Sequence, residues 1–144
     1  MTRLDTSLNI IVLAMLFAIS FATLASAQTT GQSNLRWLWP QDSIAVNQST
    51  IALISAHHTR AIQSAQRGLV NAKGNDRLIA MHNICIGWLR LREPKRAETP
   101  CSAALLAAAE AQGEVNGQPI GVIVKANIER ERSAHDVRLA KAKQ

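Results

Sequence analysis

The sequence predicts an all-α protein built from antiparallel helical hairpins. Aromatic residues make up only 3% of the chain, and tyrosine is absent. Alanine-rich segments with apolar residues three and four positions apart favour helices over strands. Near the middle of the chain, two such segments are separated by only a few residues, so their helices must lie antiparallel and side by side. A chain of 144 residues allows one such domain.

The two central helices are expected over 78–92 and from Glu93 or Pro94 to Gln112. A proline without an N–H costs nothing in the first turn of a helix, whereas Pro100 predicts a kink or a late start of the second helix. The apolar residues of each helix recur at steps that place them on one face. These residues are Leu78, Met81, Cys85, Trp88 and Leu89 in the first helix, and Ala97, Cys101, Ala104, Leu105 and Ala108 in the second.

Upstream, one helix is expected over 49–73, with Ser49 or Thr50 as its N-cap and Gly74 as its stop signal. Four of its residues repeat the spacing of the second central helix with an offset of 36 residues. We therefore interpret this helix as the second half of a degenerate upstream repeat. The matching residues are Ala61, Ala65, Gly68 and Leu69, against Ala97, Cys101, Ala104 and Leu105.

Downstream, residues 113–119 contain two glycines and an Asn-Gly pair, which predict a loop. A last helix follows from Ile120. Its apolar first half is expected to occupy the position of the first helix of the next repeat. Asn127 would then lie roughly at the position that Asn83 has in the central hairpin. Its charged second half, from Glu129 onward, is expected to be a polar cap that keeps the open end of the stack soluble.

The central hairpin alternates small and large residues, a pattern that lets two helices approach closely. The residues of this pattern are Asn83, Gly87, Trp88, Leu91, Ala97, Cys101, Ala104 and Leu105. With these residues the central hairpin resembles the tetratricopeptide repeat family, and most of all its extracytoplasmic bacterial members. Arg92 and Pro94 depart from the pattern, because the family usually has a turn glycine and often an aromatic residue there. The resemblance implies a short α-solenoid and a role in protein–protein interaction.

The N-terminus has the features of a secretory signal peptide. Arg3 lies near the start, an apolar run extends over 10–24, and Ala25-Ser26-Ala27 forms an A-x-A cleavage site. A membrane anchor is the alternative, but the run is shorter than the ~20 residues that a spanning helix needs. We expect cleavage after Ala27 and a periplasmic or secreted protein. The expected division is signal peptide 1–27, flexible leader with a tryptophan-rich segment 28–48, and helical domain 49–144.

Export changes the expectation for the two cysteines, because thiols are oxidised outside the cytoplasm. Cys85 and Cys101 lie at similar separations from the turn, so in antiparallel helices they face each other at the same height, within reach of a disulfide. The closed loop is short, and the expected stabilisation is about 3 kcal/mol. Two buried free thiols are the alternative. No further ligands accompany the pair to form a metal site.

Two surface features suggest partners. Trp37 and Trp39 belong to a segment that we expect to fold back onto the helical stack, with docking to a partner or a membrane as the alternative. A basic cluster at the central turn is interpreted as a solvated turn, with an edge for an anionic partner as the alternative. Nucleic acid is a poor candidate, because stacking aromatics do not interleave with the charges. The cluster consists of Arg90, Arg92, Lys95 and Arg96.

We expect no enzyme activity, no cofactor, no metal site and no small-molecule substrate, because no catalytic or metal-binding motif is present. The histidines are expected at the surface or its boundary. The main hypothesis is a non-catalytic interaction or scaffold module that holds a protein segment on its concave face. The alternative is a basic envelope-associated protein that binds anionic membrane or polysaccharide through the basic turn, the C-terminal tail and Trp37 and Trp39. A third hypothesis is a homodimer that completes the small core.

Overall fold

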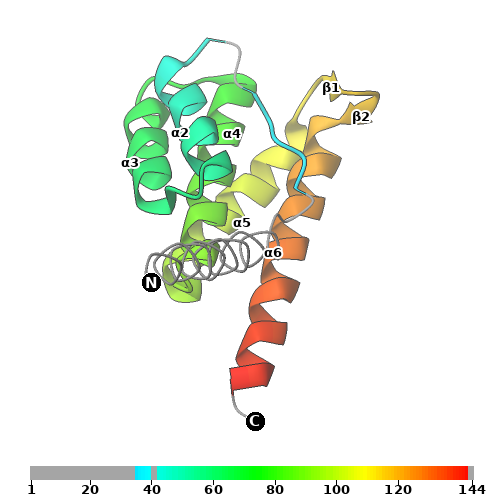
Figure 1. The fold of residues 1–144 in the computed structure, drawn as a ribbon. Coiled ribbons are helices and arrows are strands. Elements are labelled where there is room, and N and C mark those ends of the chain that lie inside the picture. Colours follow the sequence, from blue (N-terminus) through cyan, green and yellow to red (C-terminus); the bar gives the residue numbers. More distant parts are fainter. Residues whose placement is uncertain (1–34, 40–41, 143–144) are drawn as a thin grey trace, which may run out of the picture. The chain divides into compact units, whose positions relative to one another are not determined.

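The computed structural model describes residues 35–39 and 42–142, so the predicted signal peptide lies outside the described residues. The all-α prediction is confirmed (Figure 1). The helices are α2 (Ile44–Ile54), α3 (His58–Leu69), α4 (Gly74–Arg90), α5 (Pro94–Glu110) and α6 (Ile120–Ala142), with the short strands β1 (Glu114–Val115) and β2 (Gln118–Pro119) before α6.

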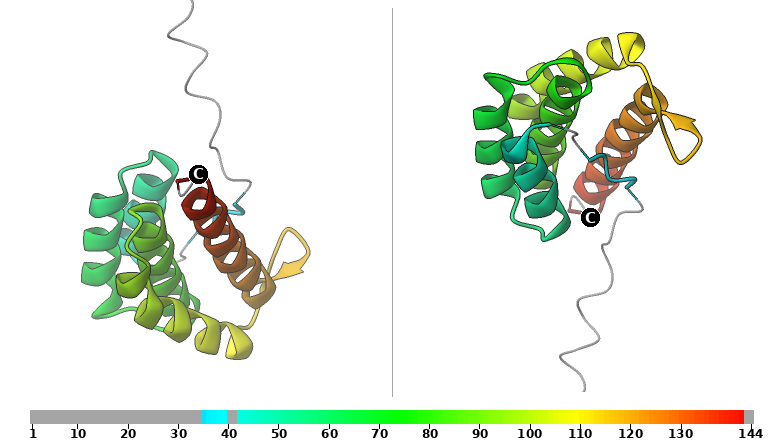
Figure 2. Two further views of the ribbon diagram at one scale, coloured as in Figure 1. Left: turned by 90° about the horizontal axis from the view of Figure 1, so that it is seen from below. Right: turned by 90° about the horizontal axis from the view of Figure 1, so that it is seen from above.

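Two antiparallel hairpins, α2–α3 and α4–α5, form most of the fold, and α6 packs beside the second (Figure 2). Helix α4 is central, because it contacts each of the other four helices. Helix α4 touches both α2 and α6. These three helices therefore provide one continuous surface for the functional site. None of the helices described combines the length and apolar content needed to cross a bilayer.

The prediction of a single helix over 49–73 is wrong, because the chain reverses direction at residues 55–57. Ala56 has a φ of 59°, which places it in the left-handed region. The N–H of Ala56 donates to Leu53 O at 3.1 Å, and the N–H of His57 donates to Ala52 O at 2.8 Å. These bonds form a Schellman motif, which ends α2 without the glycine that usually marks such a turn.

Helix α2 also begins earlier than expected, at Ile44 rather than near Ser49. The Ser43 hydroxyl caps it by accepting the N–H of Val46 at 3.3 Å. The backbone N–H of Ser43 in turn donates to the buried Asp76 carboxylate of α4 at 2.8 Å. A carboxylate more than 30 residues away thus fixes the start of the helical domain.

Helix α4 ends in the same motif as α2. Arg92 has a φ of 62°, its N–H donates to Leu89 O at 3.1 Å, and the N–H of Glu93 donates to Trp88 O at 3.0 Å. Arg92 and Ala56 are 36 residues apart, as are the ends of α4 and α2 and the starts of α5 and α3. The offset seen in the sequence is therefore a structural repeat of two complete hairpins.

We expect Ala56→Gly to raise the free energy of unfolding by about 0.5 to 1 kcal/mol, because glycine adopts a positive φ without strain. The matched control is Ala126→Gly, at an exposed position inside α6. The same chemical change should lower stability there by about 0.5 to 1 kcal/mol, since glycine weakens a helix interior. Urea unfolding followed by circular dichroism measures both changes. If both substitutions lowered the free energy of unfolding, the strain at Ala56 would be contradicted.

The predicted disulfide is confirmed: Cys85 and Cys101 are bonded, with a Cα–Cα distance of 4.8 Å, and both side chains are fully buried. Helix α5 begins at Pro94 and continues through Pro100, so the late start considered for this helix does not occur. The bond therefore joins the middle of α4 to the middle of α5.

The predicted loop over 113–119 contains a minimal β-hairpin. Glu114 pairs with Pro119, and Val115 pairs with Gln118. Positive φ values at Asn116 and Gly117, 52° and 72°, match the type I′ turn that Asn-Gly favours. Helix α6 follows directly. Its buried residues are Ile120, Ile123, Val124, Asn127, Ile128 and Glu131, so the expected apolar first half and polar second half are observed.

Candidate functional site

The segment Leu35–Trp39 lies across the surface formed by α2, α4 and α6. Leu35 and Leu38 are part of the hydrophobic core, with 6% and 1% of their surface exposed. Trp37 is partly buried against that core, whereas 53% of Trp39 is exposed. The expectation that this segment folds back onto the domain is met by Leu35, Trp37 and Leu38.

Asn127 of α6 holds the backbone of this segment with both ends of its side-chain amide. Its Nδ2 donates to Arg36 O at 2.8 Å, and its Oδ1 accepts the N–H of Arg36 at 3.2 Å. A neighbouring β-strand would satisfy the two backbone groups of a residue in a similar way. The contact therefore recognises an extended backbone rather than a particular side chain.

Thr50 of α2 supplies a second backbone contact. Its hydroxyl donates to Leu38 O at 3.1 Å and accepts Nδ2 of Asn83, a residue of α4, at 2.9 Å. Both side chains are buried, with at most 1% of their surface exposed. Because a buried amide or hydroxyl is costly without a partner, these bonds fix the positions of both side chains.

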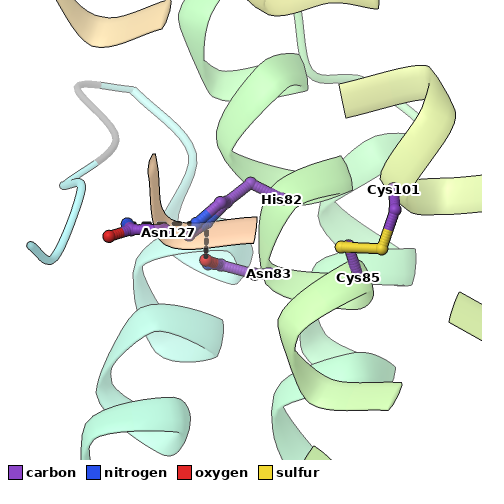
Figure 3. The surroundings of a disulfide bond; sticks show 5 residues. All are labelled: His82, Asn83, Cys85, Cys101 and Asn127. Carbon is purple, nitrogen blue, oxygen red and sulfur yellow. Dashed lines mark hydrogen bonds between the residues drawn. A yellow bond between two sulfur atoms is a disulfide. The ribbon is translucent and has the colours of Figure 1, made fainter. Parts of the chain in front are cut away.

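His82 of α4 connects Asn83 and Asn127 (Figure 3). Its Nδ1 lies 3.1 Å from Asn83 Oδ1, and its Nε2 lies 3.3 Å from Asn127 Nδ2. The Asn83 oxygen can only accept, so Nδ1 carries the proton and Nε2 accepts from Asn127. The three side chains and Thr50 form a continuous polar network beneath the segment.

The network requires a neutral histidine. The pKa of His82 is lowered to about 4: burial is the largest cause and the positive charge of Arg90 acts in the same direction, while the hydrogen bond to Asn83 opposes the shift. The expectation that the histidines lie at the surface or its boundary is wrong for His82, which is fully buried. Its neutral ring is a fixed bridge between an acceptor on α4 and a donor on α6.

Leu35–Trp39 and the surface of α2, α4 and α6 that holds it define a groove, in which Arg90 of α4 also contacts this segment. Its Nε and Nη2 both donate to Glu131 Oε1, at 3.1 and 3.0 Å, and only 3% of the Glu131 side chain is exposed. The guanidinium also lies 5.4 Å from the centre of a Trp37 ring. Arg90, one of the four cations considered as contacts for an anionic partner, is thus paired with Glu131 and packed against Trp37.

The other three predicted cations have different surroundings. Arg96 stacks on Trp88 at 4.3 Å, whereas Arg92 and Lys95 are exposed.

The remaining repeat-motif residues serve helix packing. Gly87 lets α3 approach α4, because a Cβ at this position would lie 2.6 Å from Ile62 Cγ1. Ala97 and Ala104 are buried on α5, whereas Leu91 is 37% exposed. Leu105 is partly buried and packs on the core. Of the predicted motif residues, only Asn83 belongs to the groove network.

Comparison with known proteins leaves the family open. A scan against protein-family models, a search of the curated proteins and a search of the solved structures each found no match to this chain. Membership of the tetratricopeptide repeat family therefore stays a prediction.

Proposed function

We propose that this protein is a non-catalytic interaction module, similar to a short tetratricopeptide repeat protein, that binds an extended protein segment in the groove formed by α2, α4 and α6. The observation that carries the proposal is the pairing of Asn127 with both backbone groups of Arg36. Such a contact accepts almost any residue at that position, so it suits recognition of a strand-like ligand.

Two leucines define the side-chain preference of the groove. Leu35 and Leu38 enter the core, whereas Trp39 projects partly into solvent. Burying a leucine side chain contributes about 1.5 to 3 kcal/mol, so the two leucines dominate the affinity. The preferred partner is therefore an extended segment with leucine-like residues three positions apart.

In this structure the groove is occupied by the chain's own segment, which competes with any partner. Occupation from within the same chain is intramolecular, so a partner segment must overcome a high effective concentration. We therefore expect weak binding until the segment is released. Release is the step at which the interaction would be controlled.

The proposal is tested with the variant Leu35→Asp/Leu38→Asp and a synthetic peptide of sequence NLRWLWP, which copies residues 34–40. Two charged residues cannot enter the core, so the segment should leave the groove. Isothermal titration calorimetry should then detect peptide binding to this variant and at least tenfold weaker binding to the unmodified protein. A peptide with both leucines replaced by aspartate is the negative control.

In the released variant, Asn127→Leu should weaken peptide binding about 10- to 100-fold, because two hydrogen bonds to the ligand backbone are lost. The matched control Asn71→Leu changes an exposed asparagine outside the groove and should leave the affinity within twofold. If the released variant keeps its helical circular dichroism but does not bind the peptide, the proposed function is wrong.

A further inference from the structure

A recess lies between the α4–α5 turn and the last turns of α6. Its volume is about 340 Å³, and its walls contain three permanent cations and no carboxylate. It shares His135 with a recess of about 360 Å³, in which Lys95 and Arg132 accompany Glu98 and Asp136. The residues that line the first recess are Arg92, His135, Arg138, Leu139, Lys141 and Ala142.

The positive charge of this recess is largely uncompensated. Arg92 and Lys141 have no ion-pair partner among the described residues. Arg138 lies 3.9 Å from Glu131, but that carboxylate also binds Arg90 at 3.0 Å. One carboxylate thus balances two guanidinium groups, Arg90 at Oε1 and Arg138 at Oε2, so the recess keeps a net positive charge.

Helix ends modify this charge only slightly. Helix α5 begins at Pro94 beside Lys95, and the positive end of its dipole adds to the local potential. The end of α6 contributes a partial negative charge, which Arg138 and Lys141 outweigh. The net field favours an anion with several oxygen atoms, which a guanidinium binds well.

Exposed apolar side chains accompany the cations. Leu139, in the wall of the recess, is 49% exposed. Val137 precedes Arg138 in the sequence and is 56% exposed, and Leu91 precedes Arg92 and is 37% exposed. A free anion would not use these side chains. Cations beside exposed leucine and valine suit a bilayer surface, where phosphates meet the charges and apolar residues enter the headgroup region.

We infer that this recess binds the phosphate groups of an acidic lipid surface, with Arg92, Arg138 and Lys141 as the contacts and Leu139 inserted beside them. A second copy of the chain is a poor occupant, because it would bring its own cations to the same face. None of the lipid contacts belongs to the network of Thr50, His82, Asn83 and Asn127, although Arg138 shares Glu131 with Arg90.

Vesicle co-sedimentation of the purified protein tests this inference. The protein should bind vesicles of phosphatidylcholine that contain 30% phosphatidylglycerol, and should not bind phosphatidylcholine alone. Binding should weaken as salt is raised, because screening reduces the attraction. Equal binding to both vesicle types would overturn the inference.

Two matched pairs of variants separate the site from net charge and from general hydrophobicity. Arg92→Glu/Lys141→Glu should reduce binding at least tenfold, whereas Arg60→Glu/Lys125→Glu, with the same net charge and exposed positions elsewhere, should change it less than threefold. Leu139→Ser should reduce binding severalfold. Leu106→Ser, at the 73% exposed leucine of α5, should not.

If both charge-reversal variants lost vesicle binding equally, the attraction would depend on net charge alone, and the proposed binding site would be wrong. Inorganic phosphate at 10 mM should compete no better than sulfate of equal ionic strength. Selective competition by phosphate would reassign the recess to the free anion and refute the lipid contact. Circular dichroism should show all variants to be folded, since Arg92 and Lys141 make no ion pair within the described residues.

Discussion

Replacing Cys85 and Cys101 together by alanine is expected to lower the free energy of unfolding by about 3 kcal/mol. The bond joins residues 16 positions apart and restricts the unfolded chain. Both side chains are fully buried, so lost packing adds to the loss of the cross-link. Because domains of this size are stable by only about 5 to 15 kcal/mol, the change is a large fraction of the total. Urea unfolding followed by circular dichroism measures it.

The control is Ser49→Ala, at the position 36 residues upstream of Cys85 in the first hairpin. The buried Ser49 hydroxyl has no hydrogen-bond partner among the described residues, so its removal should leave stability unchanged or slightly raised. Adding dithiothreitol should bring the unmodified protein close to the double variant. If the double variant unfolds at the same urea concentration as the oxidised protein, the bond contributes no stability.

The parts of the fold that were predicted correctly depend on local signals. Pro94 marks the start of α5, and the period of the apolar residues defines the faces that α4 and α5 share. The facing positions of Cys85 and Cys101 follow from that geometry. These features involve neighbours within one hairpin, so they can be derived without the rest of the fold.

The turn between α2 and α3 was missed because Ala56 is neither glycine nor proline. The helical period continues across it, and an alanine gives no stop signal. The sequence nevertheless contains a signal for this turn in its 36-residue repeat. Arg92 stands at a position where a turn glycine is usual, and the 36-residue offset places Ala56 at the equivalent position upstream. Applying the repeat to the turn as well as to the helices would have divided the predicted helix correctly.

The site was harder to predict because it joins distant parts of the chain. Asn127 was placed near the position of Asn83, but its partner Arg36 is 91 residues away. His82 was assigned to the surface, and that prediction failed because α4 is packed by four other helices. Almost every residue from Leu78 to Leu89 is buried, so no polar face distinguishes the inward positions. Contacts of this kind follow only from the tertiary arrangement.

Acid is expected to destabilise the protein through His82. The pKa of this residue is lowered to about 4 in the folded protein, against 6.5 for an ordinary histidine. Between pH 6.5 and about 4, the His82 ring is therefore protonated in the unfolded chain but still neutral in the folded protein. Its contribution to stability is complete above pH 6.5 and is lost across this window. Between pH 7.5 and 4.5 the loss should be roughly 2 to 3 kcal/mol.

The variant His82→Gln should reduce this pH dependence by the same amount, even if it is less stable at every pH. Its carboxylates are unchanged, so their contribution cancels in the comparison. Urea unfolding at the two pH values measures the difference. An unchanged dependence in His82→Gln would contradict the assigned role of the buried ring.

The same protonation should act on the groove. A charged imidazole donates from both nitrogens, so the Asn127 amide can no longer donate to Nε2. To avoid two opposed donors, Asn127 must rotate, and its bonds to both backbone groups of Arg36 are then lost. Acid should therefore release the segment Leu35–Trp39 before the helices unfold. The expected signal is a red shift of tryptophan emission that develops as the pH falls through about 4, the pKa of His82 in the folded protein, with helical circular dichroism retained, and that is absent from His82→Gln.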